Sequence, residues 1–126
     1  MNVLVDTSLW VEHFRRKNDV LIELLALDLV LTHPMILLEL ACGTPPEPRA
    51  KTLNDLAMLH SARVSMLGEI QAFVERHQLY GQGCGLVDVS LLCSAIITPN
   101  TRLWSIDKRL DALAARFGVA YQAKIH

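Results

Sequence analysis

The sequence has few of the features that mark disulfide-bonded, secreted or membrane proteins. Its three cysteines are odd in number and show no Cys-x-x-Cys spacing, so neither a disulfide framework nor a zinc site is indicated. No basic segment leads into an apolar one at the start, and acidic residues interrupt the longest apolar stretch, 20–42. We therefore expect a cytoplasmic protein without a membrane span, in which Cys42 and Cys93 are small buried thiols.

Net charge and aromatic residues are also scarce. Lys and Arg number 12 against 13 Asp and Glu, so composition indicates no general attraction to nucleic acid or membrane. Aromatic residues make up 6%, which leaves no face on which single-stranded bases would stack. Apolar residues, by contrast, reach 52%, and 126 residues suffice for one domain, 1–126, with a sizeable core.

Short apolar runs alternate with helical patterns along the chain. The predicted strands are 3–5, "LVLTH" at 29–33, "ARVSM" at 62–66, "RLWSI" at 102–106 and "VAYQ" at 119–122. The predicted helices begin after Thr7 or Ser8 and then cover 19–26, 34–42, 49–59, 67–79, 86–97 and 108–117. This alternation predicts an α/β fold with a central parallel sheet of four to five strands sandwiched by helices.

Four carboxylates stand where a parallel sheet would bring them together. Asp6 follows the first predicted strand and Asp107 follows the fourth, and the carboxyl ends of parallel strands share one edge. Glu39 in "PMILLELACG" and Asp88 in "GLVDVSLLCSA" each place a charge on an apolar helix face. An ionised carboxylate on such a face is costly unless it is paired or bound to metal.

Three of the four carboxylates also have a purely structural explanation. Asp6 and Asp107 can cap the helices that follow them, and Asp88 lies near a helix start. Glu39 lies in the middle of its helix, where it caps nothing. Because no Lys, Arg or His occupies a matching position, the four charges would repel one another and some of their pKa values would rise. A divalent cation removes that conflict, and an all-oxygen ligand set favours Mg²⁺ or Mn²⁺ over zinc.

The ordered set of "VDTS", a Glu in an apolar helix, an Asp opening another apolar helix and "LWSID" resembles the PIN-domain nucleases. The compact size and the order of elements resemble the VapC toxins of bacterial type II toxin–antitoxin pairs, over essentially the whole chain. The resemblance implies four catalytic residues and metal ligands: Asp6, Glu39, Asp88 and Asp107. It also implies supporting hydroxyls at Thr7, Ser8 and Ser105, the last standing where the family often has Thr.

The resemblance further implies a divalent-metal-dependent endoribonuclease that uses Mg²⁺ or Mn²⁺ and acts on RNA. It implies a homodimer that is silenced by a cognate VapB-like antitoxin. Lys108 and Arg109 adjoin Asp107 and are the candidate RNA-binding residues, whereas the basic run 15–17 is explained by its place at a helix end. For Trp10 and Phe14, core packing is expected ahead of a groove for an antitoxin segment.

Three other functions remain open at this point. One is a PIN nuclease of RNA processing or decay outside toxin–antitoxin systems. Another is a phosphatase or receiver-like domain with clustered Asp residues, although such a domain would place a Lys on a late strand and Lys124 follows the last predicted strand. The third is a non-catalytic scaffold whose carboxylates only cap helices.

Overall fold

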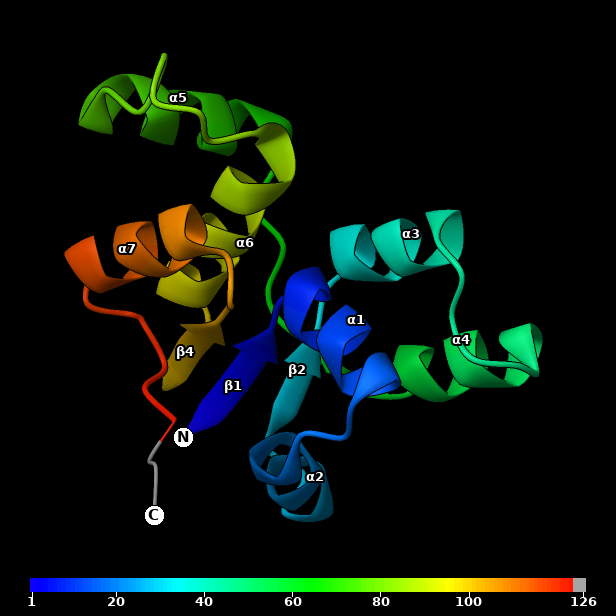
Figure 1. The fold of residues 1–126 in the computed structure, drawn as a ribbon. Helices are drawn as coiled ribbons and strands as arrows, with labels where there is room; N and C mark the ends of the chain where they lie inside the picture. The colour runs from blue at the N-terminus through cyan, green and yellow to red at the C-terminus, as the bar shows by residue number, and fades with distance from the viewer. Residues whose placement is uncertain (124–126) are drawn as a thin grey trace.

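The computed structural model describes residues 1–123, and the predicted α/β fold is confirmed in it (Figure 1). Lys124, on which the receiver-like alternative depends, lies outside this range. The strands are β1 (Asn2–Val5), β2 (Val30–Thr32), β3 (His60–Ser61) and β4 (Thr101–Trp104). The helices are α1 (Thr7–Arg15), α2 (Asp19–Ala26), α3 (Pro34–Cys42), α4 (Arg49–Ala57), α5 (Leu67–His77), α6 (Leu86–Ile97) and α7 (Lys108–Arg116).

The strands within residues 1–123 form one four-stranded sheet in the order β3-β2-β1-β4, and every pairing is parallel. β1 lies in the middle, with Val3 opposite Val30 of β2 and Arg102 of β4. Its side chains Val3 to Val5 are 0% exposed, as a strand covered on both faces requires.

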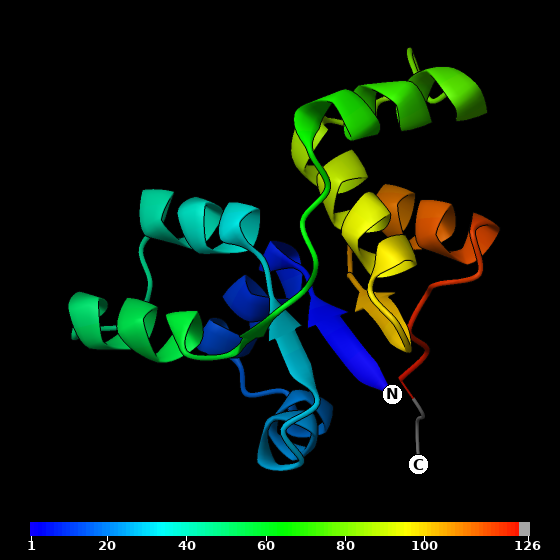
Figure 2. The ribbon, with the colours of Figure 1, turned by 180° about the vertical axis from the view of Figure 1, so that it is seen from behind.

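Helices cover both faces of the sheet. Figure 1 shows α1 and α7 on the near face and α6 on the far face, and Figure 2 shows the reverse. α5 contacts α6 and lies beyond the edge toward which the strands point. Trp10 is 3% exposed and Phe14 packs against the core, so the predicted core role of this α1 face is confirmed. Within residues 1–123 no helix is both long and apolar enough to cross a bilayer.

Two predicted strands differ from the structure. The third strand is His60–Ser61 and not 62–66, because β2 ends at Thr32, just before Pro34 opens α3. The last ladder bond runs from the Ala62 amide to the Thr32 carbonyl at 2.9 Å, and beyond it the third strand has no partner. The segment 119–122 forms only a single bridge, between Leu103 and Ala120, and so adds no full strand.

The prediction of two buried thiols is half right. Cys93 is 5% exposed on α6, and burial, with a smaller contribution from the charge of Glu69, raises the pKa of its thiol to about 11. Cys42 is exposed, which corrects the prediction, because it is the last residue of α3 and turns away from the sheet core. The apolar residues around it in the sequence therefore do not indicate a buried position.

Candidate active site at the carboxyl edge of the sheet

Asp6 occupies the centre of the carboxyl edge, directly after the central strand. Its backbone amide donates to the Trp104 carbonyl at 3.0 Å, which ties the ends of β1 and β4 together. The carboxylate is 6% exposed and accepts three hydrogen bonds: from the Thr7 amide at 2.8 Å, the Ser8 hydroxyl at 2.7 Å and the Ser105 hydroxyl at 2.8 Å. These donors compensate its burial and fix its orientation.

Ser105 links two of the predicted site residues. Its hydroxyl donates to Asp6 and accepts from the Asp107 amide at 3.0 Å. Asp107 is exposed and caps α7, where its Oδ1 accepts from the amides of Arg109 at 2.9 Å and Leu110 at 3.2 Å. Asp107 therefore caps α7, as its structural explanation predicted. The cap uses only Oδ1, so Oδ2 can still accept a hydrogen bond or bind a cation.

Thr7 and Ser8 have different partners. Ser8 bonds to Asp6, whereas the Thr7 hydroxyl donates to Glu39 Oε1 at 2.6 Å and so joins α1 to α3. The sequence left open which hydroxyl would support the site, and the structure uses both. Glu39 itself is exposed, although Ile36, three residues before it on the same helix, is fully buried. The prediction that Glu39 stands on a core-facing surface is therefore wrong for its own side chain.

Asp88 lies in the first turn of α6 and is half-buried. Burial raises the pKa of its carboxyl, and so do, in decreasing order, the charges of Asp107, Asp6 and Glu39; the Gly85 amide opposes them. Each of the other three carboxylates thus acts on Asp88, as expected of a shared site. Among residues 1–123, none of the four forms an ion pair with Lys, Arg or His.

The four carboxylates are neighbours but do not form a closed cage. Among residues 1–123, no three His, Cys, Asp or Glu side chains are placed to hold a metal ion together. Asp6 bonds to hydroxyls on one side and Glu39 bonds to Thr7 on another. The arrangement concentrates negative charge at this edge of the sheet.

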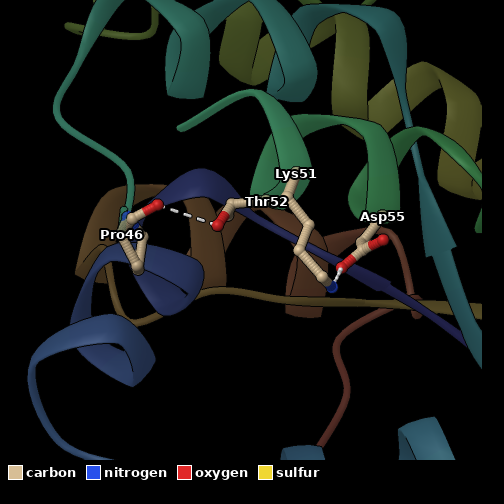
Figure 3. Close-up of polar contacts among 4 residues, drawn as sticks. All are labelled: Pro46, Lys51, Thr52 and Asp55. Atoms are coloured by element: carbon tan, nitrogen blue, oxygen red, sulfur yellow. Dashed lines mark hydrogen bonds and ion pairs between the residues drawn. The ribbon is translucent and has the colours of Figure 1, made fainter. Parts of the chain in front are cut away.

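Two basic side chains, Arg109 beside Asp107 and Lys51 on α4, have partners of their own. Lys108 is exposed beside Asp107, but the Arg109 guanidinium lies against the loop before α6, with Nη1 3.4 Å from the Gly83 carbonyl. On α4, Lys51 pairs with Asp55 at 2.8 Å, while Thr52 donates to the Pro46 carbonyl (Figure 3). Of the two predicted RNA-binding residues, Arg109 thus already has a structural contact.

A groove of about 450 Å³ runs from Glu39 between α1 and the segment that follows α3. Apolar side chains form most of its wall, and Arg15 stands in the same groove. Its lining includes Val11, Phe14, Arg15, Leu40, Pro45 and Pro46.

A parallel sheet with four carboxylates at its carboxyl edge and helices on both faces is the arrangement of a PIN domain. No protein-family model matches the chain. Two curated relatives, each named Ribonuclease VapC32, come from Mycobacterium tuberculosis strains CDC 1551 / Oshkosh and ATCC 25618 / H37Rv. Each is 41% identical over 123 residues, which cover 98% of both chains. The chain therefore belongs to the VapC family of PIN-domain toxins. This membership rules against the receiver-like alternative and favours a toxin over an RNA-processing nuclease.

Proposed function

We propose that this chain is a toxin endoribonuclease that hydrolyses RNA phosphodiester bonds with a divalent cation at the carboxyl edge of the sheet. The observation that supports the proposal is that the charges of Asp6, Glu39 and Asp107 all act on Asp88, while none of the four forms an ion pair with a cationic side chain among residues 1–123. The ribonuclease name of both relatives supports the reaction.

The donor set fits Mg²⁺ or Mn²⁺. All donors are carboxylate oxygens, which these hard cations prefer, and Mg²⁺ commonly keeps several waters while one or two carboxylates bind it directly. A cage of three side chains is therefore unnecessary. Asp6 Oδ2 accepts hydrogen bonds from both Ser8 and Ser105, whereas Oδ1 accepts one, from the Thr7 amide, and so retains a lone pair for a cation. Asp6 and Asp88 would bind the cation, with Glu39 and Asp107 completing the site directly or through water.

The cation supplies Lewis-acid chemistry, because it acidifies water and offsets the charge that develops on the phosphate. The chain's own side chains orient the carboxylates, the water and the RNA. Ser8 and Ser105 donate to Asp6 and orient it, and Thr7 donates to Glu39. Asp107, exposed and with Oδ2 outside the α7 cap, orients the attacking water or accepts its proton. Lys108 beside it contacts the RNA backbone.

A VapB-like antitoxin would block the site from the groove beside Glu39. The groove is mostly apolar and so suits the apolar face of a partner segment. A basic side chain of that segment would enter the carboxylate cluster and supply the missing counter-charge. The same contact would therefore inhibit RNA cleavage and reduce the repulsion among the four carboxylates.

We also propose a homodimer. Large apolar side chains remain exposed around two neighbouring hollows that share Leu67 and Ile70. They are Val64 at 52%, Met66 at 73%, Leu67 at 70% and Leu86 at 57% exposure. Such a patch on a small protein marks an interaction surface, and a two-fold dimer buries the same patch on both copies. Sedimentation of Met66→Lys should show a monomer where the unmodified chain shows a dimer.

The activity is tested by cleavage of total RNA with Mg²⁺, with Mn²⁺ and with chelator. Asp6→Asn and Glu39→Gln should each lower the rate about a hundredfold or more, since even outer partners of a metal contribute tenfold to a hundredfold. Glu75→Gln, an exposed carboxylate on α5, is the matched control and should cut at the unmodified rate. Cleavage that persists in chelator, or in both site variants, would reject the proposal.

A further inference from the structure

His33 is a buried histidine between the two helices that carry proposed site residues. It directly follows β2, caps the first turn of α3 and is 2% exposed. Its ring lies against Ser94 of α6, which is 0% exposed. α3 carries Glu39 and α6 carries Asp88, so the His33–Ser94 contact joins the two helices that carry these proposed site residues.

The two ring nitrogens have different roles. Nδ1 lies 3.0 Å from the Met35 amide, which can only donate, so Nδ1 accepts and carries no proton. The proton of the neutral ring is therefore on Nε2, which donates to the Ser94 hydroxyl at 3.0 Å. Burial lowers the pKa of His33 and keeps the ring in this neutral form.

The local backbone holds the ring in place. Pro34 is the first residue of α3, and a residue before proline is confined to extended conformations. His33 has φ −152° and ψ 144°, and its carbonyl accepts from the amides of Ile36 and Leu37. Within residues 1–123, the His33–Ser94 contact is the one hydrogen bond that joins α3 or its cap to α6.

We infer that His33 is a positioning residue whose hydrogen bond to Ser94 fixes the spacing between the Glu39 helix and the Asp88 helix. This rests on the proposed function, in which both carboxylates serve one cation. Cation sites lose affinity when supporting hydrogen bonds are removed, because the ligands then sample wrong separations. His33 acts through the helices and does not touch the cation.

Paired substitutions separate the two contacts of the ring. His33→Asn keeps an acceptor near the Nδ1 position for the Met35 amide but does not reach Ser94. His33→Gln keeps a donor near the Nε2 position for Ser94 but loses the cap. Ser94→Ala removes the same bridge from the other side. The control is Thr101→Val, which removes a hydroxyl that is 2% exposed and donates to the Pro99 carbonyl at the opposite edge of the sheet.

Two quantities are measured on the purified full chain: the Mn²⁺ dissociation constant by calorimetry, and amide hydrogen exchange of α3 without metal. His33→Asn and Ser94→Ala should each raise the dissociation constant about tenfold and speed exchange in α3. The double variant should be no worse than either single one, because both remove one interaction. His33→Gln should retain most of the affinity. Thr101→Val should lower the melting temperature and change neither quantity.

The inference is overturned if the unmodified chain binds Mn²⁺ and the His33→Asn and Ser94→Ala variants bind it equally well, even if they melt earlier. The ring would then serve stability alone, as Thr101 does. A different result, in which the unmodified chain neither binds Mn²⁺ nor cleaves RNA with Mg²⁺, would reject the proposed function and with it the cation part of the inference. Unchanged exchange in α3 would then overturn the positioning role too.

Discussion

Replacing Asp88 and Asp6 by Asn should change the stability of the metal-free protein in opposite directions. Asp88 is half-buried, and three other carboxylates act on it, so its ionised form is disfavoured in the fold. Asn removes the charge and keeps an oxygen for the Gly85 amide. Removing one such repulsion should add about 0.5–2 kcal/mol to the free energy of unfolding. For a chain of this size, that raises the melting temperature by about 2–8 °C.

Asp6 differs because its charge is compensated. Three donors lie within 2.8 Å of its oxygens, and two of them are hydroxyls that depend on an acceptor there. Hydrogen bonds to a charged group contribute about 1.5–3 kcal/mol each, and Asn retains only part of this. We expect Asp6→Asn to lower the free energy of unfolding by about 1–3 kcal/mol.

The difference in stability between Asp88→Asn and the unmodified chain should also depend on pH. The pKa of Asp88 is raised in the folded chain above its ordinary value of 3.8, so folding favours the protonated group. Its contribution to stability is greatest below pH 3.8 and is lost as the pH rises through the folded pKa. The advantage of Asp88→Asn should therefore be largest at neutral pH and shrink on acidification.

The assay is thermal unfolding in chelator and then in excess Mg²⁺. At about a hundred times its dissociation constant, a ligand adds about 2.7 kcal/mol to the free energy of unfolding. The unmodified chain should thus overtake Asp88→Asn when Mg²⁺ is added. If Asp88→Asn melts earlier than the unmodified chain in chelator at neutral pH, the reasoning on repulsion at this edge is wrong.

Other predictions concern the surroundings of the site. Gly83→Ala should melt slightly earlier than Gly81→Ala: both positions have positive φ, but a Cβ at residue 83 would come 2.6 Å from the flexible Arg109 guanidinium and displace it from the Gly83 carbonyl. Equal melting temperatures would show that this contact is unimportant. Lys108→Ala should weaken RNA binding and reduce its salt slope by about one, whereas Lys51→Ala should not. In nuclear magnetic resonance spectra, His33 should show the Nε2-protonated tautomer and a pKa below 6.5; a charged ring at pH 6.5 would contradict the assigned hydrogen bonds.

The sequence was sufficient to predict the fold class and the position of the strand-end carboxylates. Asp6 and Asp107 follow buried apolar runs, and parallel strands carry such residues to one edge. The third strand was misplaced because "ARVSM" has the composition of a strand, while the end of its partner strand is set by Pro34, some thirty residues away. The exposed Val64 and Met66 of that segment belong to the proposed dimer surface.

The contacts that support the site were harder to predict. His33 showed no metal-binding spacing, and its partner Ser94 lies 61 positions away. The only local signal was a polar residue between a strand and Pro34, where a helix cap is expected. The contact between Arg109 and Gly83 could not be predicted either, because these two residues are also far apart in the sequence.

The central claim is that four carboxylates at one sheet edge share a divalent cation. Calorimetric titration of Mn²⁺ into the unmodified chain, into single amide variants of Asp6, Glu39, Asp88 and Asp107, and into Glu75→Gln tests it most directly. We predict binding by the unmodified chain and Glu75→Gln, and much weaker binding by each of the other four. Equal affinity across all six proteins would contradict the claim.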